Sequence, residues 1–166
     1  MNNHNQDAVD RLAGLDPQGE LSALRRRRPE WVVGIADCRQ SVLTPADERQ
    51  LPAALRVALA MRMAMRLEHP ALTAEYQRRL TRLDTEARWQ RVAQGEDVAA
   101  PSWLAAVIAH CDNVTLSPGR CRQDDLCRLE RAGLTPPQVV ALSELIAFVN
   151  FEVRVIAGLA LLETLA

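Results

Sequence analysis

Apolar residues along this chain recur at three- and four-residue intervals, and the alternation typical of strands is missing from its long segments. Glycine and proline punctuate the chain without dividing it. The pattern predicts an all-α protein with a single domain over residues 1–166. Within it, we expect an N-terminal helical extension over 1–40 and a core over 41–166. The extension holds a short helix around 6–15 and a second amphipathic segment that Pro29 interrupts.

The centre of the chain predicts a helical hairpin over residues 52–83. Thr44 followed by Pro45 is typical of a helix cap, and Pro52 suits the first turn of a long helix that reaches about Leu67. Pro70 ends that helix in this interpretation. The segment "ALTAEYQRRLTRL" then supplies the antiparallel partner.

Three further helices follow a loose connection that contains Gln94, Gly95 and Pro101. The first is "SWLAAVIAHCDNVTL", and the second is "CRQDDLCRLERAG", which Gly133 closes at the C′ position. The last begins at Thr135 as cap, with Pro136 as its first residue and Gln138 placed as in a capping box. It is expected to run to the C-terminus.

The last helix carries polar residues inside an apolar stretch, "ELIAFVNFEVRVIAGL". At 100° per residue, Ser143, Asn150 and Arg154 project within about 40° of one another. A buried polar stripe must face a water-filled cleft or satisfy groups on neighbouring elements. A glycine inside a helix, here Gly158, is typical of close approach by another helix.

Composition narrows the possible partners. The 20 basic and 21 acidic residues nearly cancel, so no global field attracts nucleic acid or an anionic membrane.

The N-terminus lacks a basic region followed by an apolar one, which predicts a cytoplasmic protein. Asn150, Glu152 and Arg154 interrupt the most apolar segment, so no membrane-spanning helix is expected.

Four scattered cysteines form no CxxC pair and no disulfide scaffold. Cys121 lies near a helix start, where the backbone favours a thiolate, but two aspartates in the same turn oppose it; it is the candidate redox residue. Cys111 follows His110 directly, but adjacent helical side chains diverge by 100°, so these two cannot face each other as a Cys–His pair. The three histidines lie far apart in sequence without metal-ligand spacing, so no metal site is expected. No cofactor is expected either.

A family resemblance is carried by "LERAGLTPPQVVALSELIAFVNFEVRVIAGLALL" and, upstream, by "LTPADERQLPAALRVALAMRMA" and "LAAVIAHCDNVTLSPG". These segments resemble the carboxymuconolactone decarboxylase (CMD) and alkylhydroperoxidase D superfamily, in particular a bacterial branch of peroxidase-related proteins. The resemblance covers most of the chain and implies an alkylhydroperoxidase D-like helical bundle. It further implies that Asn150 and Arg154 tie the helical core together through hydrogen bonds.

Active alkylhydroperoxidase-type members carry a CxxC with a nearby His at the start of the second hairpin helix, and an acidic residue upstream. Here residues 70–78 hold no thiol, and "QLPAALRVALAMRMAMRL" holds no acid. The resemblance therefore implies an oligomeric or partner subunit with little or no peroxidase activity. Its partner is expected to be a CMD-family paralogue that retains the CxxC, or further copies of itself.

The decarboxylase side of the superfamily suggests an alternative, a non-redox enzyme acting on a small organic acid. His69 beside Glu68 is its candidate general base, and Tyr76 its candidate hydrogen-bond donor. The candidate substrate-binding residues, three of which can hold a carboxylate through a guanidinium, are Arg62, Arg66, Arg154 and Asn150.

The amount of apolar helix predicts assembly. Two long apolar helices with small residues exceed what a monomer of this size covers, which favours a symmetric homo-oligomer. The small residues are Ala60, Ala64, Ala157 and Gly158. We expect a dimer or trimer whose interface includes part of the last helix.

Overall fold

In the computed structural model, which describes residues 7–48, 51–97 and 102–165, the described chain is all-α and contains no strand. This confirms the predicted fold class. The helices are α1 (Ala8–Ala13), α2 (Glu20–Arg26), α3 (Pro29–Leu43), α4 (Ala53–Arg66), α5 (Pro70–Leu83), α6 (Gln90–Ala93), α7 (Trp103–Leu116), α8 (Gln123–Arg131) and α9 (Pro136–Leu165), with a 3-10 turn at Pro118–Arg120.

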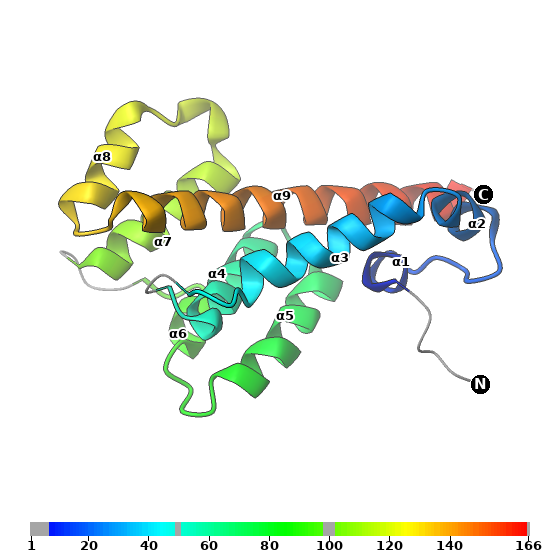
Figure 1. Cartoon of the computed structure of the whole chain (residues 1–166), viewed down its shortest axis with the longest axis horizontal. Helices are drawn as coiled ribbons and strands as arrows, with labels where there is room; N and C mark the ends of the chain where they lie inside the picture. The colour runs from blue at the N-terminus through cyan, green and yellow to red at the C-terminus, as the bar shows by residue number, and fades with distance from the viewer. Residues whose placement is uncertain (1–6, 49–50, 98–101, 166) are drawn as a thin grey trace.

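Helix α9 is the spine of the molecule (Figure 1). It contacts α1 near its C-terminal end, α3 from about Glu144 onward, and α4, α7 and α8 elsewhere. Its start is fixed as the sequence predicts, because the backbone N–H of Thr135 donates to Gln138 Oε1 at 2.7 Å. Pro136 is its first residue. In Figure 1, α7 and α8 lie at one end of this spine, and α1 and α2 lie at the other.

The central hairpin is confirmed, but the predicted roles of two boundary residues, Pro70 and Thr44, need correction. Pro52 immediately precedes α4, but α4 ends at Arg66, and Pro70 opens α5 instead of closing α4. Thr44 caps no helix start; it follows the last residue of α3, and its N–H donates to the carbonyl of Gln40. Helix α4 is buried over most of its length because α5, α6, α7 and α9 all pack against it.

The N-terminal part is more than an appendage to the core. The expected boundary at residue 40 falls inside α3, whose last turn buries Val42 and Leu43. Helix α3 runs beside α9, and α1 also packs against α9. Gly133 follows α8 with φ of +101°, a conformation that glycine adopts without strain, as its C′ position predicts.

Candidate functional site between helices α3 and α9

The polar residue at the centre of α9 that matters most is Glu152, which is completely buried. Its Oε1 accepts from Nε of Arg39 on α3 at 2.6 Å and also from Nη2 of the same guanidinium. Its Oε2 accepts from the hydroxyl of Tyr76 on α5 at 2.5 Å. One carboxylate therefore joins three helices, and 113 residues separate it from its arginine.

The electrostatics of this cluster hold Tyr76 as a donor. Burial raises the pKa of the Tyr76 hydroxyl well above its usual range, and the neighbouring Glu152 carboxylate raises it further. The Nη1 atom of Arg39 is buried without a hydrogen-bond partner among the described residues. The cluster is closed to solvent, so its geometry fits the joining of helices rather than turnover of a ligand.

Asn150 and Arg154, which flank Glu152 on α9, differ in the contacts they make. Asn150 Nδ2 donates to Thr115 Oγ1 on α7 at 3.3 Å and to the carbonyl of Ile146 at 3.0 Å. Arg154 Nη1 donates to the carbonyl and Oδ1 of Asn150, at 2.6 and 3.0 Å. Asn150 thus connects two helices, whereas the described contacts of Arg154 stay within α9 and leave its side chain exposed.

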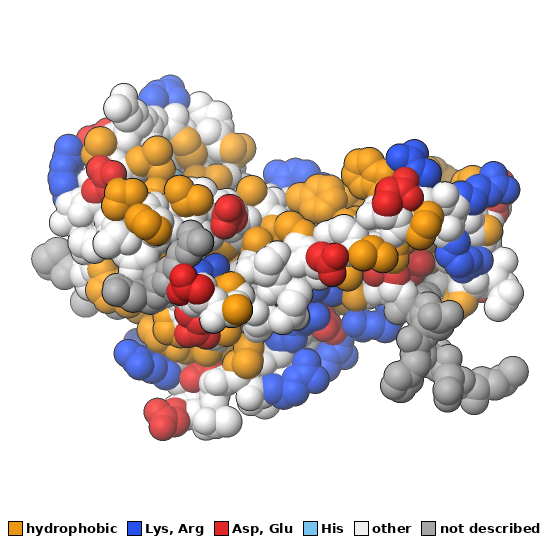
Figure 2. All heavy atoms as spheres, viewed as in Figure 1, with side chains coloured by type: hydrophobic (Ala, Val, Ile, Leu, Met, Phe, Trp, Pro, Cys, Tyr) orange, Lys and Arg blue, Asp and Glu red, His pale blue; other side chains and the backbone are white. Residues whose placement is uncertain are grey.

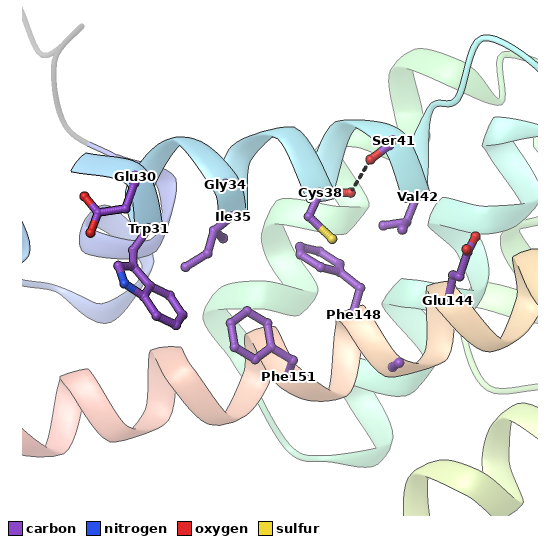
Figure 3. Close-up of a pocket in the computed structure, with 11 residues that line it drawn as sticks. Glu30, Trp31, Gly34, Ile35, Cys38, Ser41, Val42, Glu144, Phe148 and Phe151 are labelled. Atoms are coloured by element: carbon purple, nitrogen blue, oxygen red, sulfur yellow. Dashed lines mark hydrogen bonds between the residues drawn. The ribbon is translucent and has the colours of Figure 1, made fainter. Parts of the chain in front are cut away.

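Beside the cluster lies a groove of about 780 Å³ between α3 and α9, called here the α3–α9 groove. Figure 3 shows its aromatic and aliphatic side chains pointing into the space between the two helices. Its main lining residues are Trp31, Gly34, Ile35 and Cys38 from α3, and Glu144, Ala147, Phe148 and Phe151 from α9. The wall is therefore largely apolar, with Glu30 and Glu144 as its carboxylates.

The thiol that faces this groove is a weak nucleophile. Burial raises the pKa of Cys38, and the carboxylates of Glu144 and Glu152 raise it further. In Figure 3 its sulfur lies near the ring of Phe148. The Cys38 side chain is exposed at the groove, so the raised pKa, rather than inaccessibility, is what limits its reactivity.

At the hairpin bend, the residues expected to form one catalytic pocket make separate contacts. His69 caps α5: its Nδ1 accepts from the backbone N–H of Leu72 at 3.3 Å. Glu68 is exposed, with φ of +54°. Tyr76 lies inside the core and donates to Glu152. The described hydrogen bonds therefore do not join His69 with Tyr76.

Two of the candidate carboxylate-binding arginines share an internal partner. Arg62 is fully buried; its Nε and Nη2 grip both carboxylate oxygens of Asp112, at 2.9 and 2.7 Å. Its remaining nitrogen donates to the carbonyl of Glu96, and Nη2 also reaches Asp97. The Asp112 carboxylate raises the pKa of Arg62. Arg66, which is exposed, bonds the same aspartate at 3.0 Å.

Cys121 lies two residues before α8 rather than in its first turn. Its sulfur accepts from Asn113 Nδ2 at 3.6 Å. It shares a smaller cavity of about 360 Å³ with His110, a neighbour that the sequence did not indicate. The adjacent Cys111 is fully buried, and desolvation raises its pKa. Among the described residues, no three His, Cys, Asp or Glu side chains are grouped as a metal would require.

One helix of the described chain, α9, is long and apolar enough to cross a bilayer, with a mean hydropathy of 2.0 over its best 18-residue window. This corrects the expectation that its polar residues shorten the apolar run below that length. The core helix of a folded protein passes the same test. Here Glu152, inside this run, is neutralised by Arg39 of another helix.

Comparison with protein-family models, with curated proteins and with solved structures returned no match for this chain. The CMD resemblance therefore stays a prediction. Any functional proposal for this chain therefore rests on the contacts described above.

Sequence reasoning missed the members of the site that α3 supplies. Arg39, the partner of Glu152, is one arginine among 20, and no local signal distinguishes it. Trp31 carries a weak signal, because a large aromatic residue on an amphipathic helix is a frequent contact residue. Glu152 stood out only as an acid in an apolar stretch.

Proposed function

We propose that this chain is an oligomeric helical subunit with little or no peroxidatic turnover, and that the α3–α9 face is its assembly surface. The observation that carries the proposal is the apolar character of the exposed residues on that face. Trp31 is 57% exposed and Phe151 is 41% exposed, one on each side of the groove. Figure 2 shows apolar side chains spread over the centre of the molecule, where α3 and α9 run in Figure 1.

Contact between water and this apolar face is unfavourable. Burying a large apolar side chain stabilises an assembly by about 1.5–3 kcal/mol. A contiguous apolar surface flanked by charged groups is typical of a protein interface.

The chemistry of the thiols supports the weak-turnover part of the proposal. A peroxidatic cycle needs an activated thiolate and a resolving partner. Residues 70–78 hold no cysteine. The pKa values of Cys38 and Cys111 are raised by burial, which opposes thiolate formation.

The contacts of Arg62 give the alternative, an enzyme acting on a small organic acid, little support. A substrate carboxylate would have to displace Asp112 from a bidentate pair inside the fold. His69, its candidate base, uses Nδ1 to cap α5.

Two measurements on the purified chain test the proposal. Light scattering across a dilution series is expected to show an oligomer that dissociates on dilution, and Phe151→Asp is expected to shift the chain to monomer. Leu83→Asp is the matched control, since Leu83 is 43% exposed on α5, outside the groove. Thiol-dependent turnover of an alkyl hydroperoxide is expected to be near background.

A wild-type chain that stays monomeric at high concentration would refute the assembly surface, as would equal effects of the two aspartate variants. Rapid hydroperoxide turnover abolished by Cys121→Ser would refute the absence of peroxidatic chemistry. Co-purification with a CxxC-containing chain, lost in Phe151→Asp, would show the same surface serving a hetero-oligomer.

A further inference from the structure

The outward face of α9 carries a seam with alternating four- and three-residue spacing. Every member of the seam is exposed: Val140, Glu144, Ala147, Phe151, Arg154 and Gly158. At 100° per residue all of them project within about 40° of one line along the helix. A 4-3-4-3-4 spacing is that of the a and d positions along which two helices interlock.

No helix of the described chain lies across this seam, although α3 flanks Glu144, Ala147 and Phe151 along the α3–α9 groove. A side chain placed on Gly158 would meet no atom within 4 Å, so the close approach predicted for this glycine is not made by another helix of the same chain. Glu144 has no ion-pair partner among the described residues, and Arg154 bonds only within its own helix. The seam therefore holds one acid and one base without an oppositely charged neighbour.

The seam is complementary to itself when a second copy runs in the opposite direction. In an antiparallel pair of helices related by a twofold axis, a positions face d positions of the partner. With the axis level with residue 149, Glu144 faces the second copy's Arg154. The same register sets Ala147 against Phe151 and Val140 against Gly158. Each layer thus pairs opposite charges, or a large side chain with a small one.

A parallel pairing of the same seam is worse in five of its six layers. It would set Glu144 against Glu144 and Arg154 against Arg154, and like charges across an interface are unfavourable. It would also leave the small Ala147 and Gly158 layers underfilled while two Phe151 rings compete for one layer.

Resting on the proposed assembly function, we propose that the partner on this surface is a second copy of the chain. The two copies are related by a twofold axis that crosses their α9 helices antiparallel near residue 149. The interface is isologous, so each copy contributes Ala147 and Phe151 at the crossing and one Glu144–Arg154 pair on either side. Trp31 stands on the flanking α3, across the groove from Phe151 (Figure 3).

Charge reversal tests this register directly. Glu144→Arg and Arg154→Glu each create two like-charge layers, and each is expected to raise the dimer dissociation constant by about tenfold or more. The double variant Glu144→Arg/Arg154→Glu restores opposite charges and is expected to return to within about threefold of wild type. The matched control is reversal of Asp124 and Arg128, an exposed pair on α8, which is expected to leave dimerisation unchanged.

Cross-linking provides a second readout that does not depend on charge. Ala147→Cys and Phe151→Cys chains, each with Cys38, Cys121 and Cys127 changed to Ser, are mixed and oxidised. The mixture is expected to give more disulfide-linked dimer than either chain alone. A circular-dichroism melt of each variant confirms that it is folded.

The outcomes separate the two proposals. A dimeric wild type whose double charge variant stays as weak as the singles, and whose mixed cysteine chains link no better than either chain alone, overturns the antiparallel register and leaves the assembly function standing. A wild type that is monomeric at every concentration overturns both. A monomeric wild type that floats with phosphatidylcholine vesicles also overturns both, and assigns the seam to a lipid surface.

Discussion

Replacing Glu152 tests how the spine helix is held to the rest of the fold. In Glu152→Met, the guanidinium of Arg39 keeps its charge in a side chain that is 6% exposed, and the hydroxyl of Tyr76 loses its acceptor. Leaving a buried charge unpaired costs about 3–5 kcal/mol. Small domains are stabilised by about 5–15 kcal/mol in total, so this single change removes a large part of the stability.

The same physics predicts that removing both charges is milder than removing one. Arg39→Met/Glu152→Met takes two ions out of a buried site and replaces them with side chains that suit it. We expect the double variant to lose about 1–2 kcal/mol, mainly from the unpaired Tyr76 hydroxyl. The effects of the two single variants are therefore strongly non-additive.

Urea unfolding followed by circular dichroism measures these free energies, with protein concentration held fixed because assembly adds to apparent stability. Arg128→Met, which removes an exposed guanidinium from its ion pairs with Asp124 and Asp125, is the control and is expected to change stability by at most about 0.5 kcal/mol. Single variants at Arg39 and Glu152 that each lose under about 1 kcal/mol would refute the reasoning. So would a double variant that loses the sum of the two.

Three further predictions follow from other clusters. Burial raises the pKa of Glu75, but hydrogen bonds from Arg78, Arg79 and Arg11 outweigh it and lower the pKa to about 2, so its contribution is present above pH 4.5 and lost as pH falls toward 2. Glu75→Gln should flatten the acid limb of a stability–pH curve by about 1–2 kcal/mol, less than the full shift because the guanidiniums are partly solvated; an unchanged limb would contradict this. Arg62→Lys should lower the free energy of unfolding by about 1–3 kcal/mol, because an ammonium cannot bind both carboxylate oxygens of Asp112 as a guanidinium does. A melting temperature equal to that of wild type would contradict this role of the bidentate pair. Iodoacetamide should label Cys38 slowly because its pKa is raised, and more slowly still at high protein concentration because the proposed assembly covers the groove. Cys111 is buried and should stay unlabelled until the chain unfolds; early labelling of Cys111, located by mass spectrometry, would contradict its burial.

Local signals in the sequence located most of the helices correctly. The hairpin over 52–83, helix α7 and the start of α9 all follow from residues within one turn of each boundary. The predicted roles of Pro70 and Thr44 were wrong because each residue type suits either the end of one helix or the start of the next. Pro70 stops a preceding helix as readily as it begins the next.

The candidate site was less accessible to such reasoning. Periodicity placed Asn150 and Arg154 on one face of the last helix, and the structure keeps them together. It also indicated that Glu152 is an acid in an apolar environment. Nothing local indicates that Arg39 neutralises it or that Asp112 occupies Arg62, because each pair joins helices far apart in sequence.

The sequence by itself thus determined which segments are helical and which residues share a face of each helix, because a 3.6-residue repeat and its caps are properties of neighbouring residues. The tertiary structure alone decided which face of each helix turns inward. It buried Glu152 against Arg39 and Tyr76, and it left the seam from Val140 to Gly158 uncovered. The physical reason is that burial depends on what packs against a helix, and on α9 apolar residues lie on nearly every side, so periodicity could not select one.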